Sequence, residues 1–262
     1  MNFPSSFFLL LYCNSLYTHN RVLQQYISPP LLLNGRKFHI RAYVLCVDAL
    51  RVYLCKDCLA LCAGSRYQDD DTSNLLAHIT NTCYQQVDPD FDETSCVLLW
   101  NDVASILVAN GTCTDLEQAT AKIAQVNRDM ASITAELFAV FEHEFAVFQP
   151  IPGCFEHYGL DFIIEANSWN VYLLEVNPGP DFKQTGSRLQ GVIQNLMLAT
   201  IDVALVRRSD QQDENMIDKH KKNDSVFVAA PDCPCPDNLT LVYNKKQSMT
   251  ARGNPTMNIK LT

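Results

Sequence analysis

The sequence predicts an α+β protein in which helices pack against an antiparallel sheet. Short apolar runs follow one another early in the chain and are separated by the turn dipeptides Asn34-Gly35 and Asp48-Ala49. Such dipeptides between alternating segments are typical of β-hairpins. Residues 115–148 and 188–207 instead carry apolar side chains at helical spacing. Hairpins and helices that occupy separate stretches of the chain favour an α+β architecture over an alternating α/β one.

Each predicted element has its own local signal. Thr114 and Glu117 form a capping-box pattern that opens the helix at 115–148, and Pro150 and Pro152 end it. A shorter helix is expected at 96–107. The predicted strands cover residues 22–27, 38–47, 50–55, 59–63, 160–165 and 171–174, with short candidates at 226–230 and 239–243.

Composition divides the chain into three parts. Residues 1–21 show no clear period and are interpreted as a divergent or misassigned start. Residues 22–207 carry the predicted elements and form the expected domain. Residues 209–224 are charged and almost free of apolar side chains, so we expect 208–262 to be a linker and a flexible tail.

Charge and cysteine content limit the classes of partner. The net charge of −9 disfavours nucleic acid, and no segment approaches the length of a membrane span. Most of the eleven cysteines lie in apolar runs, which indicates reduced thiols and a cytoplasmic protein. Cys55, Cys58 and Cys62 are spaced loosely like a zinc knuckle, and zinc remains a minor alternative.

The stretch 171–183 holds the strongest functional signal. Glu175 and Asn177 interrupt an apolar strand, and their spacing places both side chains on one face. Burying a carboxylate is costly unless it is paired or bound to a metal. Both residues offer oxygen atoms, which Mg²⁺ prefers as ligands.

A third carboxylate is predicted across the hairpin. If Glu165 pairs with Val171, Asp161 stands opposite Glu175, and the two Cβ atoms are roughly 5 Å apart. A divalent cation between the two carboxylates would turn repulsion into coordination. The alternatives are carboxylates at a solvated strand end, or carboxylates paired with Arg or Lys.

A basic strand face is the second functional signal. Lys37, His39 and Arg41 alternate along one face of the strand at 38–47, which suits an anionic ligand or, alternatively, a solvated surface. If Val47 pairs with Leu50, Lys56 stands opposite Arg41.

Taken in order, these segments resemble a known family. The tubulin–tyrosine-ligase-like family of the ATP-grasp superfamily is similar over residues 22–207, and the run at 180–186 (PDFKQTG) is most similar to its fungal members. The resemblance is carried by six motifs in order: Gln24-Gln25-Tyr26-Ile27, residues 35–41 (GRKFHIR), residues 50–54 (LRVYL), His78-Ile79-Thr80-Asn81, residues 158–162 (YGLDF) and residues 174–177 (LEVN).

The resemblance implies the C-terminal lobe of an ATP-grasp fold and a Mg²⁺-dependent ligase. Such enzymes phosphorylate a carboxylate with ATP, and an amine then attacks the acyl-phosphate to form an amide. Arg41 matches the arginine at the transferred phosphate. The implied magnesium ligands are Asp161, Glu175 and Asn177. The implied nucleotide contacts are Gln24, Gln25, Tyr26 and Ile27 of a hinge, with Lys37, His39, Thr80 and Asn81. Tubulin or another acidic protein tail would be the acceptor.

The chain also departs from the family pattern. His39 stands where the family usually has Asp, and Leu61 where it has a second arginine. Lys56 is a candidate to supply the missing charge. No room exists upstream of Gln24 for the family's N-terminal domain and glycine-rich phosphate loop. These departures favour, as the alternative, an inactive fragment or pseudoenzyme that serves as an interaction module.

Overall fold

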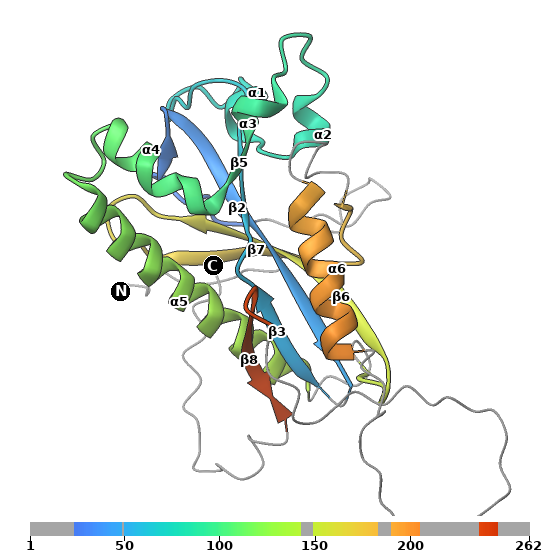
Figure 1. Cartoon of the computed structure of the whole chain (residues 1–262). Coiled ribbons are helices and arrows are strands. Elements are labelled where there is room, and N and C mark those ends of the chain that lie inside the picture. Colours follow the sequence, from blue (N-terminus) through green and yellow to red (C-terminus); the bar gives the residue numbers. More distant parts are fainter. Residues whose placement is uncertain (1–23, 49, 143–148, 183–189, 205–235, 246–262) are drawn as a thin grey trace, which may run out of the picture.

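The computed structural model describes residues 24–48, 50–142, 149–182, 190–204 and 236–245 (Figure 1). Within them, eight strands form one sheet in which all pairings are antiparallel. The order β5-β4-β2-β3-β8 runs along one path, and β6 and β7 continue the sheet from β2. The predicted α+β class is therefore confirmed.

The strands and helices follow one another along the chain. The strands are β1 (Leu32–Leu33), β2 (Arg36–Val47), β3 (Arg51–Cys55), β4 (Leu59–Cys62), β5 (Val97–Leu99), β6 (Phe155–Ile164), β7 (Val171–Pro178) and β8 (Leu239–Asn244). The helices are α1 (Leu75–His78), α2 (Thr82–Gln85), α3 (Glu93–Cys96), the 3-10 helix η1 (Trp100–Asp102), α4 (Val103–Ala109), α5 (Leu116–Phe141) and α6 (Gln190–Ala204).

Helices cover both faces of the sheet, α4 and α5 on one and α6 on the other (Figure 1). Alternation along β2 sends Phe38, Ile40 and Val44 into the core beneath α4 and α5. Tyr43 and Leu45 enter a second core beneath α6. The two cores are separated by the sheet, so β2 is buried on both sides.

The turn predicted at Asn34-Gly35 is present, and it joins β2 to β1, a short strand that was not predicted. Both residues have positive φ, 52° and 75°, which two-residue hairpin turns of the primed type require. Leu33 pairs with Arg36 directly across the turn. The strand predicted at 22–27 is wrong for residues 24–27, which belong to no strand.

The register predicted for the hairpin between β2 and β3 is wrong by one residue. Val47 pairs with Arg51, so three residues connect the strands instead of two. Asp48 and Leu50 both have positive φ, and the Leu50 side chain is buried. A buried leucine in the turn was not foreseen from Asp48-Ala49, and its burial favours the longer connection.

The hairpin between β6 and β7 combines a correct and an incorrect prediction. Asp161 pairs with Glu175, as expected. Ile164, not Glu165, pairs with Val171, and the register shifts at a β-bulge between Asp161 and Phe162. The bulge adds one residue on β7, which restores the predicted pairing at the carboxylates.

The long helix begins at Leu116, one residue later than predicted. Asp115 is the N-cap, and its carboxylate accepts a hydrogen bond of 2.8 Å from the backbone of Gln118. The Gln118 side-chain oxygen in turn accepts a hydrogen bond from the backbone N–H of Thr114. A reciprocal pair of capping hydrogen bonds is therefore present, one residue later than predicted. The helix ends at Phe141, and residues 143–148 of the predicted helix lie outside the described residues.

Two other predictions need correction. The helix expected at 96–107 is interrupted, because Val97–Leu99 pairs with β4 as β5. The short strand predicted at 239–243 is confirmed, because Leu239–Asn244 pairs with β3 as β8, so the segment 208–262 is more than a linker and a tail. The rest of that tail, the candidate strand at 226–230, the start at 1–21 and the ends of the helix at 188–207 lie outside the described residues.

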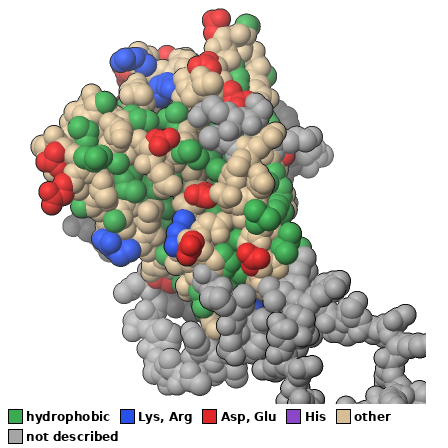
Figure 2. Space-filling model, in the orientation of Figure 1, with side chains coloured by type: hydrophobic (Ala, Val, Ile, Leu, Met, Phe, Trp, Pro, Cys, Tyr) green, Lys and Arg blue, Asp and Glu red, His purple; other side chains and the backbone are tan. Residues whose placement is uncertain are grey.

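The described residues contain no helix that is both long enough and apolar enough to span a membrane. On the face shown in Figure 2, the Lys and Arg side chains are scattered and form no continuous basic surface.

Candidate functional site

Three charged side chains lie in a row across the sheet. Arg41 of β2 pairs with Asp161 of β6, which in turn pairs with Glu175 of β7. Directly opposed residues of antiparallel strands project from the same face. This row follows the face that α6 covers farther along β2, where Tyr43 and Leu45 are packed. The sheet therefore brings together a cation and the two predicted carboxylates.

Arg41 and Asp161 form a buried two-point ion pair. The guanidinium Nε donates to Asp161 Oδ1 at 2.5 Å, and Nη2 donates to Oδ2 at 2.9 Å. Both side chains are almost fully buried. Burial alone would lower the pKa of Arg41, but the hydrogen bonds and charge of Asp161 raise it, so the cation is secure. One of the alternatives left open by the sequence, a carboxylate satisfied by Arg, is therefore present at Asp161.

Gly159 makes room for this arrangement. A Cβ atom at Gly159 would lie 3.0 Å from Pro180 Cβ and 3.5 Å from both Cδ and Nη1 of Arg41. The arginine side chain and the turn after β7 therefore both rest against bare backbone. Gly159 belongs to the motif at residues 158–162, but this role was not predicted from the sequence.

Glu175 and Asn177 project from the same face, as predicted from their spacing. They pair with Asp161 and Gly159 of β6. Glu175 is exposed, and its Oε1 accepts a hydrogen bond of 3.0 Å from Asn177 Nδ2. The carboxylate of Glu175 and the amide oxygen of Asn177 are thus accessible beside the buried Asp161.

His39 and Thr80 join this row from the other side of Arg41. His39 Nδ1 lies 2.5 Å from Thr80 Oγ1, and its Nε2 lies 3.8 Å from Asp161 Oδ1. Burial, helped by the charge of Arg41, lowers the pKa of His39 to about 3. The imidazole is therefore neutral, and it is turned toward protein groups.

Gln85 holds Thr80 in position and was missed from the sequence. This fully buried amide donates to the carbonyl oxygens of Leu76 and Ile79 and accepts from the backbone of Gly64 at 2.9 Å. It thereby ties the turn between α1 and α2 to the end of β4. Only its burial, which the sequence did not reveal, marks Gln85 as important.

Asn81 has a local structural role. It is the N-cap of α2, and its Oδ1 accepts from the backbone of Cys83 at 2.9 Å. An amide at this position of a helix is a common cap. Its expected contact with a nucleotide stays a prediction.

Lys37 and Tyr26 come together as a second group at the start of β2. The lysine ammonium donates to the Tyr26 hydroxyl at 2.9 Å and lies over its ring, 4.2 Å from the centroid. That hydroxyl also contacts His78 Nδ1 at 2.8 Å. Burial lowers the pKa of Lys37 to about 8. Gln24 and Gln25 are exposed and Ile27 is partly buried.

Lys56 does not stand opposite Arg41. Leu59 occupies that place, because residues 56–58 interrupt the strand that β3 and β4 form along one edge of β2. Lys56 is exposed and instead lines a surface hollow with Asp57, Arg128 and Asp237. The longer turn accounts for one residue of this difference and the break at residues 56–58 for the rest, so the proposed compensation for Leu61 loses its geometric basis.

Leu61 is fully buried and pairs with His39. It belongs to the apolar core beneath α6. The position where the family carries a second arginine is therefore part of the packing in this chain.

The cysteine cluster gives no support for zinc. Cys55, Cys58 and Cys62 are free and buried, and burial raises the pKa of all three thiols, to about 12 for Cys55 and Cys62. Across the described residues, no three His, Cys, Asp or Glu side chains come together as a metal site. The magnesium set has only two such side chains, with Asn177 as the third member.

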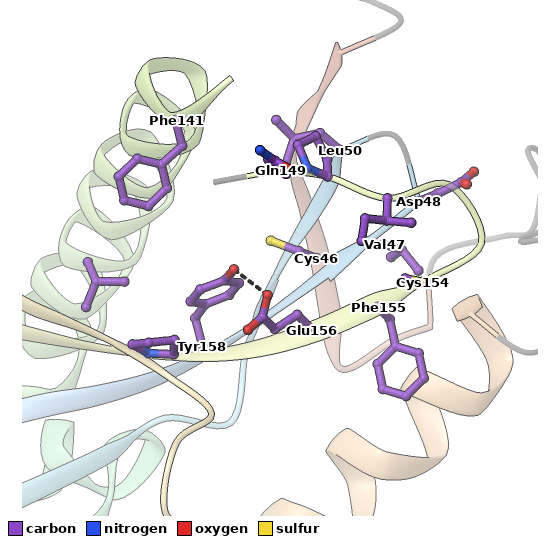
Figure 3. Close-up of a pocket in the computed structure, with 14 residues that line it drawn as sticks. Cys46, Val47, Asp48, Leu50, Phe141, Gln149, Cys154, Phe155, Glu156 and Tyr158 are labelled. Atoms are coloured by element: carbon purple, nitrogen blue, oxygen red, sulfur yellow. Dashed lines mark hydrogen bonds between the residues drawn. The ribbon is translucent and has the colours of Figure 1, made fainter. Parts of the chain in front are cut away.

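A cavity of about 380 Å³ lies on the opposite face of the sheet (Figure 3). Its lining is mainly apolar and includes Cys46, Phe141 and Tyr158, whose hydroxyl donates to Glu156 at 2.7 Å. The cavity was not predicted from the sequence, although Leu50, Tyr158 and Val176 of its lining belong to the motifs named above. The cavity is separated by the sheet from the row formed by Arg41 and Asp161.

Comparison with known proteins identifies the family. Residues 14–214 match the tubulin-tyrosine ligase family. The chain belongs to this family. It is 38% identical over 190 residues to a Schizosaccharomyces pombe protein named as a probable tubulin–tyrosine ligase, covering 71% of this chain and 42% of the relative. A Saccharomyces cerevisiae protein named as the probable tubulin–tyrosine ligase PBY1 is 33% identical over 216 residues, covering 75% of this chain and 27% of the relative.

More distant relatives and a solved structure agree. Human tubulin polyglutamylase TTLL11 is 26% identical over 250 residues, covering 84% of this chain and 35% of that protein. The C-terminal domain of Kluyveromyces lactis Pby1, described as an ATP-grasp enzyme interacting with the mRNA decapping enzyme Dcp2, superposes with a TM-score of 0.51 at 26% identity. The match covers 68% of this chain and 45% of that one. The chain thus spans less than half the length of these proteins.

Proposed function

We propose that this chain supplies part of the site of an ATP- and Mg²⁺-dependent carboxylate–amine ligase, which adds an amino acid to a protein such as tubulin. The observation that carries the proposal is the row of Arg41, Asp161 and Glu175 across three adjacent strands. Family membership supports the reaction class, and the names of the tubulin-modifying relatives support the acceptor. The free thiols of the described cysteines support a cytoplasmic location.

The donor set fits magnesium in chemical type. Mg²⁺ is commonly held by one or two carboxylates together with substrate phosphates and water. Glu175 offers an exposed carboxylate, and Asn177 keeps its amide oxygen available because its Nδ2 binds Glu175. Asp161 keeps further lone pairs on oxygens already oriented by Arg41. These three residues are the proposed magnesium ligands.

Mg–ATP, when bound, would supply a γ-phosphoryl group to activate the acceptor carboxylate, and phosphate would leave when the amine forms the amide. Arg41 is the proposed contact for the anionic oxygens of that group. Asp161 engages only Nε and Nη2, so Nη1 remains for a charge-assisted hydrogen bond to a ligand. Lys37 is a second cation for the nucleotide, beside Tyr26 of the proposed hinge.

The test is binding of Mg–ATP to the full chain and to Glu175→Gln, measured by calorimetry. Glu175 is exposed, so the variant is expected to fold normally while losing at least tenfold in affinity for Mg–ATP. Glu136→Gln, which changes a charge on α5 away from the site, serves as the control for a change of charge alone. The proposal fails if the wild-type chain does not bind Mg–ATP, or if Glu175→Gln binds as the wild type does.

A second candidate is an inactive interaction module. The buried Leu61 favours it, because an apolar side chain stands beside His39 where the family has a cation. A human relative that is 29% identical over 191 residues is named an inactive polyglycylase, and K. lactis Pby1 is described as interacting with another protein. Ligase turnover by the chain, assayed with tubulin peptides and labelled amino acids, would exclude this candidate.

A further inference from the structure

His39 is the residue at this site whose contacts are least explained. It is 6% exposed on β2, between Arg41 and the start of the strand. Nδ1 is 2.5 Å from Thr80 Oγ1, which belongs to the turn between α1 and α2. Nε2 is buried without a hydrogen-bond partner among the described residues, and Asp161 Oδ1 lies 3.8 Å away. The imidazole therefore lies between two residues of the proposed site.

The protonation state limits what His39 can do. His39 is buried, and Arg41 already balances the charge of Asp161 through two hydrogen bonds, so a second cation at His39 would be uncompensated and the ring is neutral. A neutral imidazole carries one N–H and one lone pair, on different nitrogens. Two tautomers remain, and they place opposite partial charges beside Asp161.

Electrostatics distinguish the tautomers. With the proton on Nδ1, His39 would donate to Thr80, and the Nε2 lone pair would face the carboxylate of Asp161. With the proton on Nε2, the N–H dipole faces that carboxylate, and the hydroxyl of Thr80 donates to Nδ1. A threonine hydroxyl can both donate and accept, so Thr80 is satisfied in either case. Only the second arrangement is attractive at both nitrogens.

We propose that neutral His39, with its proton on Nε2, is a positioning residue that couples Thr80 to Asp161. Arg41 fixes the carboxylate of Asp161 through two donors, and His39 adds a third dipole directed at Oδ1. The hydrogen of the Thr80 hydroxyl is committed to His39, which leaves Thr80 as an acceptor toward any ligand. The effect on ligand binding rests on the proposed function, but the tautomer and the coupling do not.

The first experiment uses the full wild-type chain without metal or nucleotide. Two-dimensional ¹⁵N–¹H NMR that correlates ring nitrogens with ring protons distinguishes the two neutral tautomers and the imidazolium. We expect the pattern of a neutral ring protonated at Nε2 at pH 7. A ring protonated at Nδ1, or an imidazolium, overturns the proposal without reference to any ligand.

The second experiment separates the two contacts with matched variants. The amide nitrogen of His39→Gln can replace Nε2 and direct an N–H toward Asp161, whereas the side-chain oxygen of His39→Asn can replace Nδ1 as the acceptor for Thr80. We expect His39→Asn to weaken binding of Mn²⁺–ATP by about 10- to 100-fold, which is the size of effect seen for groups that orient metal ligands. We expect His39→Gln to retain most of the wild-type affinity. Amide hydrogen exchange at residues 79–82 should quicken in His39→Gln and stay near wild type in His39→Asn.

The outcomes also separate this inference from the proposed function. If the wild type shows the Nε2–H ring and the exchange pattern but does not bind Mn²⁺–ATP, the ligase proposal fails and the coupling stands. If Mn²⁺–ATP binds but both variants weaken it equally, with equal exchange at residues 79–82, His39 is a packing residue and the inference fails. If either variant does not fold, the ring tautomer of the wild type decides alone.

Discussion

The two faces of β2 differ in the side chains that they carry. Toward α4 and α5, every alternate residue from Phe38 onward is apolar, with Phe38, Ile40 and Val44 in one continuous core. Toward α6, the face changes character along its length, from Tyr43 and Leu45 in a second core to the buried polar groups at its start. One strand thus contributes packing on one side and both packing and charge on the other.

This difference shows how the site obtains its rigidity. Buried ionic groups contribute little net stability and are costly when left unpaired, whereas apolar burial stabilises at roughly 25 cal/mol per Å². The continuous core holds β2 in place, and the polar half of the other face inherits that fixed geometry. We therefore expect the two faces to respond differently to substitution, in the ways that follow.

The largest effect is expected on the polar side. Arg41→Met leaves Asp161 buried without its partner, and we expect the free energy of unfolding to fall by about 3–5 kcal/mol in urea denaturation. The double variant Arg41→Met/Asp161→Leu should recover much of this loss, because it removes both charges. Lys245→Met is the comparison, because Lys245 is partly exposed and the buried Glu142 keeps the hydrogen bond from Tyr243, so this variant should lose less than Arg41→Met. Equal losses for Arg41→Met and Lys245→Met would contradict the burial argument.

On the apolar side of β2 we also expect a loss of stability, but one that depends on packing and not on charge. Ile40→Ala removes a fully buried side chain, which should cost about 2–5 kcal/mol in the same assay. No second substitution at the polar site should rescue it. Leu198→Ala, on the exposed side of α6, should stay within about 0.5 kcal/mol of wild type. A rescue of Ile40→Ala by charge removal would mean that the two faces are not independent.

The smallest effect concerns pH. The folded pKa of His39 lies at about 3, below its ordinary value of 6.5. The unfolded chain therefore binds the extra proton first, so this contribution to stability is complete above pH 6.5 and is lost as pH falls toward 3. The slope is at most about 1.4 kcal/mol per pH unit. Unfolding measured between pH 6 and 4 should be less steep in His39→Gln than in wild type, and identical slopes would contradict a buried neutral imidazole.

Sequence patterns predicted the structure correctly where interactions between neighbouring residues determine it. Asn34-Gly35 specifies a tight turn by its tolerance of positive φ, and alternation fixed which residues of β2 share a face. The opposition of Asp161 and Glu175 was also predicted, although the assumed pairing nearer the turn was wrong and a bulge corrected it. Residue spacing was thus sufficient to place the carboxylates together.

The sequence predictions failed where residues far apart in the chain determine the strand register or pairing. The burial of Leu50 lengthened the β2–β3 turn, and the break at residues 56–58 moved Lys56 away from Arg41. The short strand predicted at 239–243 is present as β8, but its pairing with β3 was not predicted from the sequence. A short run of mixed composition becomes a strand when an open sheet edge offers it hydrogen bonds.

By itself, the sequence determined the α+β class, the antiparallel hairpins and the set of oxygen-bearing residues, because turn preferences and side-chain alternation act over a few residues. Only the tertiary structure decided how those residues are used. It engaged Asp161 with Arg41, directed Asn81 to cap α2, and placed His39 between Thr80 and Asp161. Such choices depend on burial and on partners far along the chain, and burial sets the cost of leaving each polar group without a partner.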